Sequence, residues 1–303
     1  MKQRILSLVP GATEIIAALG ASGELVGISH ECDYPAEVTG LPRVTSSAVS
    51  SAQSSLAIDA SVRAIAIEGQ PLFMIDAGLL AALAPTLIVT QALCDVCAVS
   101  DGEAMRLAAV MDPAPRVVSF VGSTLTGVWD DIRLLGAALG RDAHAHALVA
   151  SLEARLRSVH ETLRHARAPR PRVAVIEWLD PVYAAGHWTP DVVRCAGGID
   201  VLAQPGSHSV RIDASRIRDA SPDLLLFAPC GFDVHRARAE AESLLASPGW
   251  AWARGREAWA LDGNALTSRP GPRLADAVEA MAAIVAPALF PAPPARYAVN
   301  LTR

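Results

Sequence analysis

The stretch DAHAHALVASLEARLRSVHETLRHARA, residues 142–168, decides the fold of this chain because it contains neither glycine nor proline. Its larger apolar residues recur three or four positions apart, which is the spacing of one face of an α-helix. They are Leu148, Leu152, Leu156, Val159 and Leu163. At about 1.5 Å per residue, such a helix is about 40 Å long. We predict a rigid connector between two lobes, with an ordinary crossover helix inside one large sheet as the alternative.

Short apolar runs alternate with helical stretches on both sides of this segment. Continuous apolar runs are typical of strands that are buried on both faces of a parallel sheet. The expected strands cover residues 5–9, 25–28, 86–90, 117–120, 172–178, 224–228 and 258–261. The expected helices cover residues 13–19, 77–83, 126–139, 190–196 and 271–285. The predicted fold class is α/β, with two Rossmann-like lobes, parallel-rich sheets, one bridging helix and a ligand cleft between the lobes.

The domain boundaries follow from these elements. We predict an N-terminal α/β lobe over residues 1–125, a helical connector over 126–168 and a C-terminal α/β lobe over 169–290. The tail over residues 291–303 reads PAPPARYAVNLTR and shows no hydrophobic periodicity. We expect it to be a loosely ordered end.

Composition excludes several function classes. The chain has 303 residues and a net charge of -5, with scattered arginines, so nucleic-acid binding is not expected. No apolar stretch approaches the roughly 20 residues needed to span a bilayer. Pro10, Gly11 and Glu14 interrupt the region where a signal peptide would need an apolar run, and five cysteines do not suggest a disulfide framework. We therefore expect a cytoplasmic protein with free thiols, or a periplasmic one if the chain has been trimmed.

Polar, aromatic and sulfur-bearing motifs follow four of the expected strands. They are HECDYP (30–35), TQALCDVC (90–97), EWLDP (177–181) and APCGF (228–232). In open parallel sheets, ligands bind outside the carboxyl ends of the strands. The candidate ligand-binding residues in and near these loops are His30, Glu31, Cys32, Cys94, Cys97, Glu177, Trp178, His187, Trp188 and Cys230. The tryptophans suit a flat macrocycle, or alternatively pack in the core.

The CxxC pair Cys94 and Cys97 allows several interpretations. Its spacing is typical of zinc sites, and the candidates for further ligands are Cys32, His30, Cys230 and His187. A structural zinc site normally uses a second close pair, which this sequence lacks. The pair precedes a helix rather than starting it, which argues against thioredoxin-like redox chemistry. Buried thiols, a soft pocket wall and an axial ligand to cobalt or iron also remain open.

Six segments together resemble a known family. They are RILSLVPGATEIIAALG (4–20), LVGISHECDYP (25–35), LAALAPTLIVTQ (80–91), AGG (196–198), SPDLLLFAPCGF (221–232) and the stretch from PGWAWARG to AAIVAP (248–287). The chain is similar to class III periplasmic substrate-binding proteins, the binding components of uptake transporters for cobalamin, haem and iron-siderophore complexes. The cobalamin-binding group looks most similar.

The resemblance implies a ligand, a partner and one further residue. It implies that a cobalamin-type corrinoid, or another metal chelate or tetrapyrrole, binds in the cleft. An ABC transporter permease is the implied partner if the protein is exported. Arg269, which precedes the last helix, is implied to lie near the cleft, where it would meet an anionic group of the ligand.

The residues also permit a second function. A cytoplasmic hydrolase or transferase on the same scaffold could use a cleft Cys, His or Glu, possibly with a thiolate-bound metal such as zinc. The binding protein is favoured because the resemblance runs along nearly the whole chain. No catalytic residue is assigned.

Overall fold

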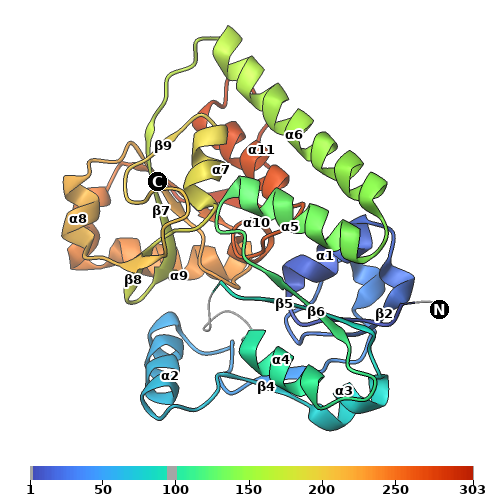
Figure 1. Cartoon of the computed structure of the whole chain (residues 1–303). Helices are drawn as coiled ribbons and strands as arrows, with labels where there is room; N and C mark the ends of the chain where they lie inside the picture. The colour runs from blue at the N-terminus through green and yellow to red at the C-terminus, as the bar shows by residue number, and fades with distance from the viewer. Residues whose placement is uncertain (1–2, 94–100, 303) are drawn as a thin grey trace. The chain divides into compact units, whose positions relative to one another are not determined.

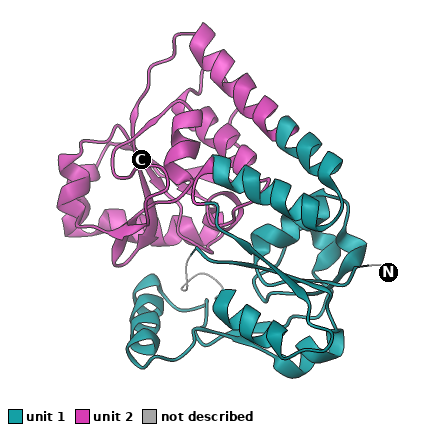
Figure 2. Cartoon of the chain, viewed as in Figure 1, with its two compact units in different colours: residues 1–122, 126–150 teal, residues 123–125, 151–303 magenta. Residues whose placement is uncertain are grey.

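The computed structural model describes residues 3–93 and 101–302, which form two compact units (Figure 1). Unit 1 comprises residues 1–122 and 126–150, and unit 2 comprises residues 123–125 and 151–303 (Figure 2). Each unit has its own sheet. The long helix α6 (Asp142–His165) begins in unit 1 and ends in unit 2.

Unit 1 is built on a four-stranded sheet in the order β2-β1-β5-β6, in which all neighbours are parallel. Its strands are β1 (Ile5–Ser7), β2 (Leu25–Ile28), β5 (Leu87–Gln91) and β6 (Arg116–Phe120). Every residue of β1 and β5 is buried, which explains their continuous apolar sequences. A separate antiparallel pair consists of β3 (Thr45–Ser47) and β4 (Phe73–Ile75).

Helices cover both faces of the unit 1 sheet. Figure 1 shows α1 and α5 on one face and α3 and α4 on the other. The helices are α1 (Pro10–Ala18), α2 (Ser55–Ile67), α3 (Ala77–Leu83), α4 (Asp101–Ala109) and α5 (Leu125–Ala138), with 3-10 turns η1 (Ser22–Glu24) and η2 (Ala36–Val38). Two starts have clear local causes, because a proline opens α1 and the Asp76 carboxylate caps α3 by accepting from Leu79 N at 2.8 Å.

Unit 2 contains a mixed seven-stranded sheet in the order β10-β8-β7-β11-β12-β13, with β9 paired to β7. Strands β7, β11 and β12 run parallel, whereas β8, β10 and β13 pair antiparallel. The bounds are β7 (Arg172–Leu179), β8 (Val182–Ala184), β9 (Ile199–Asp200), β10 (Val210–Arg211), β11 (Leu224–Phe227), β12 (Glu257–Leu261) and β13 (Ala298–Asn300). The parallel centre places three carboxyl ends at one edge of the sheet.

The core of unit 2 includes one face of this sheet and the elements packed on it. Phe227 and Trp250 lie in this core, with ring centroids 5.8 Å apart. The helices are α7 (Thr189–Cys195), α8 (Ala214–Asp219), α9 (Val234–Ala246), α10 (Gly263–Leu266) and α11 (Leu274–Val285), with the 3-10 segment η3 (Pro248–Ala253). Arg155 on α6 pairs with Asp276 and Glu279 of α11, each at 2.6 Å. These ion pairs tie the second half of the long helix to its own unit.

The structure corrects two local expectations. The long helix ends at His165, before the predicted residue 168, because Arg167 adopts a left-handed φ of 49° and Pro169 follows. The C-terminal tail was expected to be loosely ordered, but Ala298–Asn300 form β13 and pair with β12. The tail is ordered because β13 pairs with β12 at the edge of the sheet, although the sequence pattern of the tail does not predict a strand.

Candidate functional site

Two loops meet at the carboxyl edge of the unit 2 sheet. The first follows β11 and contains Gly231 and Phe232. The second follows β12 and begins with the short helix α10, which contains Asn264, and continues to Ser268. Asn264 N donates to Phe232 O at 3.1 Å, and Gly231 N donates to Ser268 Oγ at 3.2 Å. These bonds hold the two loops together where the parallel strands end.

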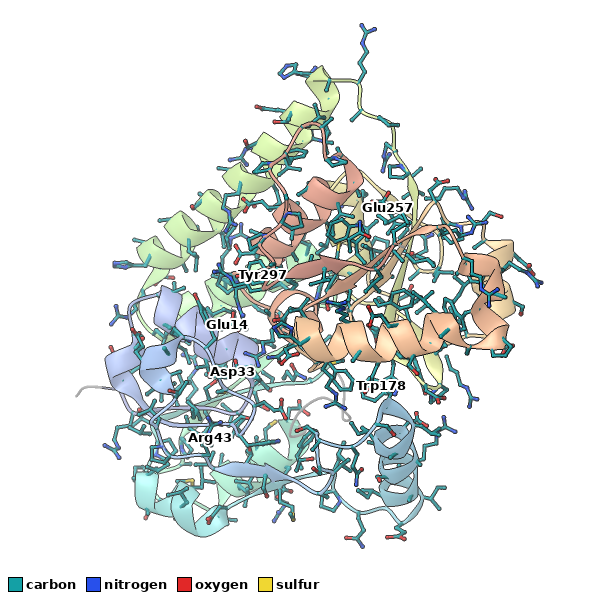
Figure 3. All side chains as sticks on the ribbon, turned by 180° about the vertical axis from the view of Figure 1, so that it is seen from behind. Glu14, Asp33, Arg43, Trp178, Glu257 and Tyr297 are labelled. Carbon is teal, nitrogen blue, oxygen red and sulfur yellow. The ribbon has the colours of Figure 1, made fainter. Side chains whose placement is uncertain are left out.

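Trp178, near the end of β7, forms an aromatic pair with Phe232 from the first loop. Their ring centroids lie 5.3 Å apart, and the Arg236 guanidinium carbon lies 3.4 Å from the Phe232 ring centroid. Phe232 is buried, whereas Trp178, which is labelled in Figure 3, is half-buried. Trp178 Nε1 is buried and has no hydrogen-bond partner among the residues that the structure describes. A ligand acceptor at this position would satisfy an otherwise costly indole N–H.

Glu177 and Cys230 lie beside this pair. The Glu177 carboxylate accepts from Gly186 N at 3.4 Å, and its carbonyl accepts from Cys230 N at 3.0 Å. A carboxylate at the end of a buried apolar strand needs a partner, and the backbone N–H of Gly186 supplies one. Cys230 itself is exposed.

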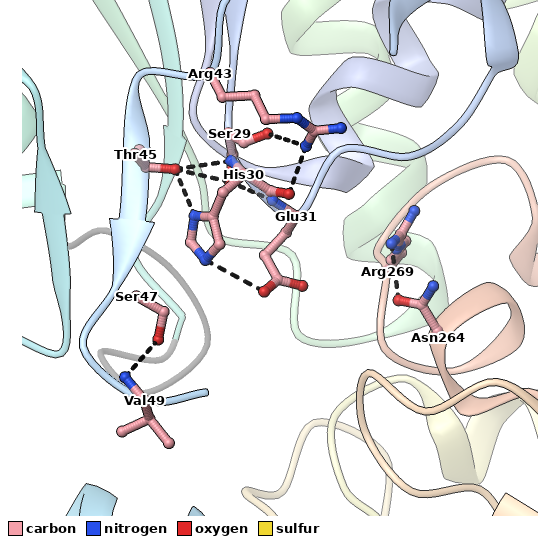
Figure 4. A network of polar contacts seen from close by, with 9 residues as sticks. All are labelled: Ser29, His30, Glu31, Arg43, Thr45, Ser47, Val49, Asn264 and Arg269. Atoms are coloured by element: carbon pink, nitrogen blue, oxygen red, sulfur yellow. Dashed lines mark hydrogen bonds and ion pairs between the residues drawn. The ribbon is translucent and has the colours of Figure 1, made fainter. Parts of the chain in front are cut away.

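Trp188 and Arg269 are more deeply buried, at 7% and 4% exposure. The Trp188 indole donates to Thr267 O at 2.8 Å, so its polar atom is already paired within unit 2. Arg269 donates to Asn264 Oδ1 at 2.7 Å (Figure 4). Arg269 therefore lies in the loop after α10, and its bond to Asn264 ties this loop to α10.

His187 lies beside Trp188 in a left-handed backbone conformation, with φ of 53°. Its ring lies 5.4 Å from the ring of His208, centroid to centroid. Burial lowers the pKa of His187, and the nearby His208 lowers this pKa further. His187 is therefore a neutral imidazole at neutral pH.

The lowered pKa of His187 predicts an acid-sensitive contribution to stability. As pH falls, the unfolded chain, with a pKa near 6.5, takes up the proton before the folded protein does. The free energy of unfolding therefore decreases as pH drops through about 6.5 towards the folded pKa. We expect His187→Asn, which tolerates the left-handed backbone, to show a smaller loss between pH 7.5 and 5.5.

Urea unfolding at both pH values measures this difference. The exposed His235 on α9 supplies the control, and His235→Asn is expected to keep the wild-type pH dependence. An unchanged pH dependence in His187→Asn would contradict the assignment.

In unit 1, His30 and its neighbours form a polar network after β2 (Figure 4). Both the backbone N and the ring Nδ1 of His30 contact Thr45 Oγ1, at 2.9 and 2.7 Å. Thr45 Oγ1 also contacts Ser29 Oγ at 3.2 Å. The tautomer of His30 decides which of Nδ1 and Thr45 Oγ1 is the donor, and the other ring nitrogen, Nε2, lies 3.3 Å from Glu31 Oε1.

Arg43 completes this network from the backbone side. Its Nη1 donates to His30 O at 2.5 Å and to Ser29 O at 3.4 Å. The loop after β2 is thereby fixed to the segment that leads into β3. His30 and Glu31 are adjacent in the sequence, so their proximity is expected. No feature of the sequence indicates that Thr45 and Arg43 contact His30.

Cys32 is a buried thiol in the same unit. Its Sγ lies 3.0 Å from Thr13 Oγ1, and Thr13 Oγ1 donates to Ser7 Oγ at 2.8 Å. With the threonine hydrogen used for Ser7, the Cys32 S–H is the donor to Thr13. Burial in this arrangement is typical of a structural thiol.

The predicted zinc site stays a prediction. Cys94 and Cys97 lie outside the described residues, so their relation to Cys32 is not part of the structure. Within residues 3–93 and 101–302, no group of three or more His, Cys, Asp or Glu side chains could hold a metal ion. In the same part of the chain, no helix is both long and apolar enough to cross a membrane.

Comparison with known proteins places this architecture in a family. Residues 5–254 match the model of the periplasmic binding proteins, and the chain belongs to that family. Across 278 residues it is 23% identical to the vitamin B12-binding protein of Vibrio cholerae serotype O1, covering 91% of this chain and 87% of the relative.

Two solved structures resemble the chain along nearly its whole length. A periplasmic heme-binding protein of Pseudomonas aeruginosa has a TM-score of 0.75 and 21% identity, covering 100% of this chain and 99% of that one. The periplasmic vitamin B12-binding protein of Vibrio cholerae has a TM-score of 0.64 and 21% identity, covering 93% and 96%. The predicted α/β two-lobe fold of class III is confirmed. The ligand cleft predicted between the lobes stays a prediction.

Proposed function

We propose that this protein binds a flat metal-chelate macrocycle, a cobalamin-type corrinoid or a haem, as the substrate-binding component of an uptake system. Family membership supports the binding role. The names of two similar proteins, one for vitamin B12 and one for heme, support the ligand class. The observation that carries the proposal is the half-buried Trp178, whose indole N–H lacks a partner among the described residues.

Trp178 and Phe232 supply an aromatic surface for such a ligand. A macrocycle has extended π-faces and an apolar rim, and aromatic side chains bury large areas against such groups. The Trp178 indole N–H would donate to an amide or carboxylate oxygen at the ligand edge. Arg236, held against Phe232, adds positive charge at the same edge of the sheet.

Trp178→Ala is expected to weaken binding about 30-fold, because aromatic anchors at binding sites contribute about 2 kcal/mol or more. Hydroxocobalamin and haemin are titrated separately, and their visible absorption bands report binding. Trp178→Phe keeps a ring but removes the N–H, and its smaller loss isolates the hydrogen bond. Trp252→Ala is the matched control, since Trp252 is also half-buried with no partner for its indole N–H among the described residues, but it stacks on Trp250 in η3, which precedes β12, and not at a strand end.

The outcomes separate the possibilities. Loss of binding in Trp178→Ala with wild-type binding in Trp252→Ala supports the proposal. Equal affinity in the wild type and Trp178→Ala excludes Trp178 from the ligand surface. No spectral change with either ligand in the wild type excludes the tetrapyrrole class. Circular dichroism confirms that each variant is folded.

We further propose that the partner is the permease of an ABC transporter, as befits a substrate-binding protein. Export would be required for such a partner, so this proposal corresponds to the periplasmic alternative rather than to the predicted cytoplasmic location. Fractionation of cells that express the full gene product tests this directly. Recovery in the cytoplasmic fraction alone would overturn the transporter role and leave ligand binding to be tested separately.

A further inference from the structure

The loops around residues 186–188 and 204–209 of unit 2 are joined by their backbones. His187 N donates to Ser207 O at 2.6 Å, and Gly206 N donates to His187 O at 2.9 Å. A Cβ added at Gly186 would lie only 2.5 Å from Ser207 O and from Ser209 N, so glycine permits this close approach. The two loops therefore hold fixed positions relative to each other.

These loops present two histidines to each other. The rings of His187 and His208 lie 5.4 Å apart, centroid to centroid, at an interplanar angle of 89°. Two imidazoles that bind one metal ion with metal–nitrogen bonds of about 2.0–2.1 Å place their ring centroids about 5 Å apart. The observed centroid separation is close to this value, and His208 is exposed, so a change of its rotamer would let both rings face one ion.

One ring nitrogen of this pair has no hydrogen-bond partner among the described residues. His187 Nε2 is buried and makes no hydrogen bond within the described residues. A buried polar atom in this state costs free energy unless a ligand satisfies it. His187 also holds a left-handed backbone conformation, with φ of 53°, and such conformations cluster at ligand clamps.

We propose that His187 and His208 bind a divalent transition metal ion of the zinc or copper class. Imidazole nitrogen is a preferred ligand of these ions, and water would occupy the remaining coordination positions. Ser209 Oγ, on the same loop as His208, is also buried without a partner among the described residues and offers a further oxygen. The site needs no tetrapyrrole, so it goes beyond the proposed function.

The experiment uses Zn²⁺ alone, followed by calorimetry at pH 7.5, with Cu²⁺ as a spectroscopic probe. His208→Ala is the principal variant, because its exposed side chain can be removed without disturbing the core. His187→Gly is the second, since glycine accepts the left-handed backbone. His235→Ala, an exposed histidine of the same unit, is the control.

We expect one Zn²⁺ per chain in the wild type and in His235→Ala, and at least tenfold weaker binding in His208→Ala and His187→Gly. The Cu²⁺ electron paramagnetic resonance spectrum is expected to show two coupled imidazole nitrogens in the wild type. Binding that persists unchanged in His208→Ala, a spectrum with one nitrogen, or no binding by the wild type overturns the proposal. Hydroxocobalamin and haemin titrations are run separately, so failure of one proposal is distinguishable from failure of the other.

Discussion

Phe227→Ala is expected to lower the free energy of unfolding by about 3–5 kcal/mol, the usual range for truncating a fully buried phenylalanine. Phe227 is 0% exposed and is the last residue of β11. It pairs in register with Ile176 of β7 and Ala260 of β12. Its ring packs against Trp250 within a core that also contains Ala237.

The large effect follows from the position of Phe227 at the centre of the sheet. Neighbouring strands on both sides prevent the backbone from collapsing into the space left by the ring, so a cavity remains. Urea unfolding followed by circular dichroism measures the change. Leu289→Ala is the control, because Leu289 is 37% exposed and its truncation should cost no more than about 0.5 kcal/mol. A loss below about 1 kcal/mol in Phe227→Ala would show that the core rearranges freely.

Gly263→Ala is expected to destabilise unit 2 by about 3 kcal/mol, at the upper end of the cost of overpacking. A Cβ at Gly263 would lie 2.1 Å from Pro229 O and 2.8 Å from the carbonyl of Ala228. These contacts are backbone atoms, so no flexible side chain can move aside. The loop after β12 must shift away from the loop after β11 to accommodate the methyl group.

This shift affects the candidate site as well as stability. Asn264 N would separate from Phe232 O, and the Trp178–Phe232 pair would lose its support from the second loop. Thermal unfolding gives the stability change, and a ligand titration gives the effect on the site. Gly249→Ala is the matched control, since a Cβ there meets nothing within 4 Å. Equal stability of the two variants would contradict the close approach at Gly263.

Much of the strand-end arrangement in unit 2 could be predicted from the sequence. EWLDP begins within the last residues of β7 and APCGF follows β11, and these parallel neighbours place their ends at one edge of the sheet. The sequence pointed to Trp178 and Glu177 but not to their partners. Phe232 lies within the APCGF motif, but a single aromatic residue in a loop does not indicate a binding site until its neighbour is known.

Other contacts in the candidate site could not be predicted from the local sequence. His187 and His208 are distant in sequence, and only the joined loops bring their rings together. Thr45 reaches His30 from β3, a strand that the periodicity did not indicate because it is short and polar. Trp188 and Trp178 looked alike as sequence, but only Trp188 has its indole N–H bonded to a carbonyl.

The sequence by itself determined the α/β class, the long helix and the family, because these depend on periodicity, on the absence of helix breakers and on motifs spread over the chain. Only the tertiary structure decided which polar side chains near the strand ends have a hydrogen-bond partner among the described residues and which do not. It also placed the C-terminal segment in the sheet as β13. Hydrogen-bond satisfaction and edge pairing depend on partners distant in sequence, which no local pattern encodes.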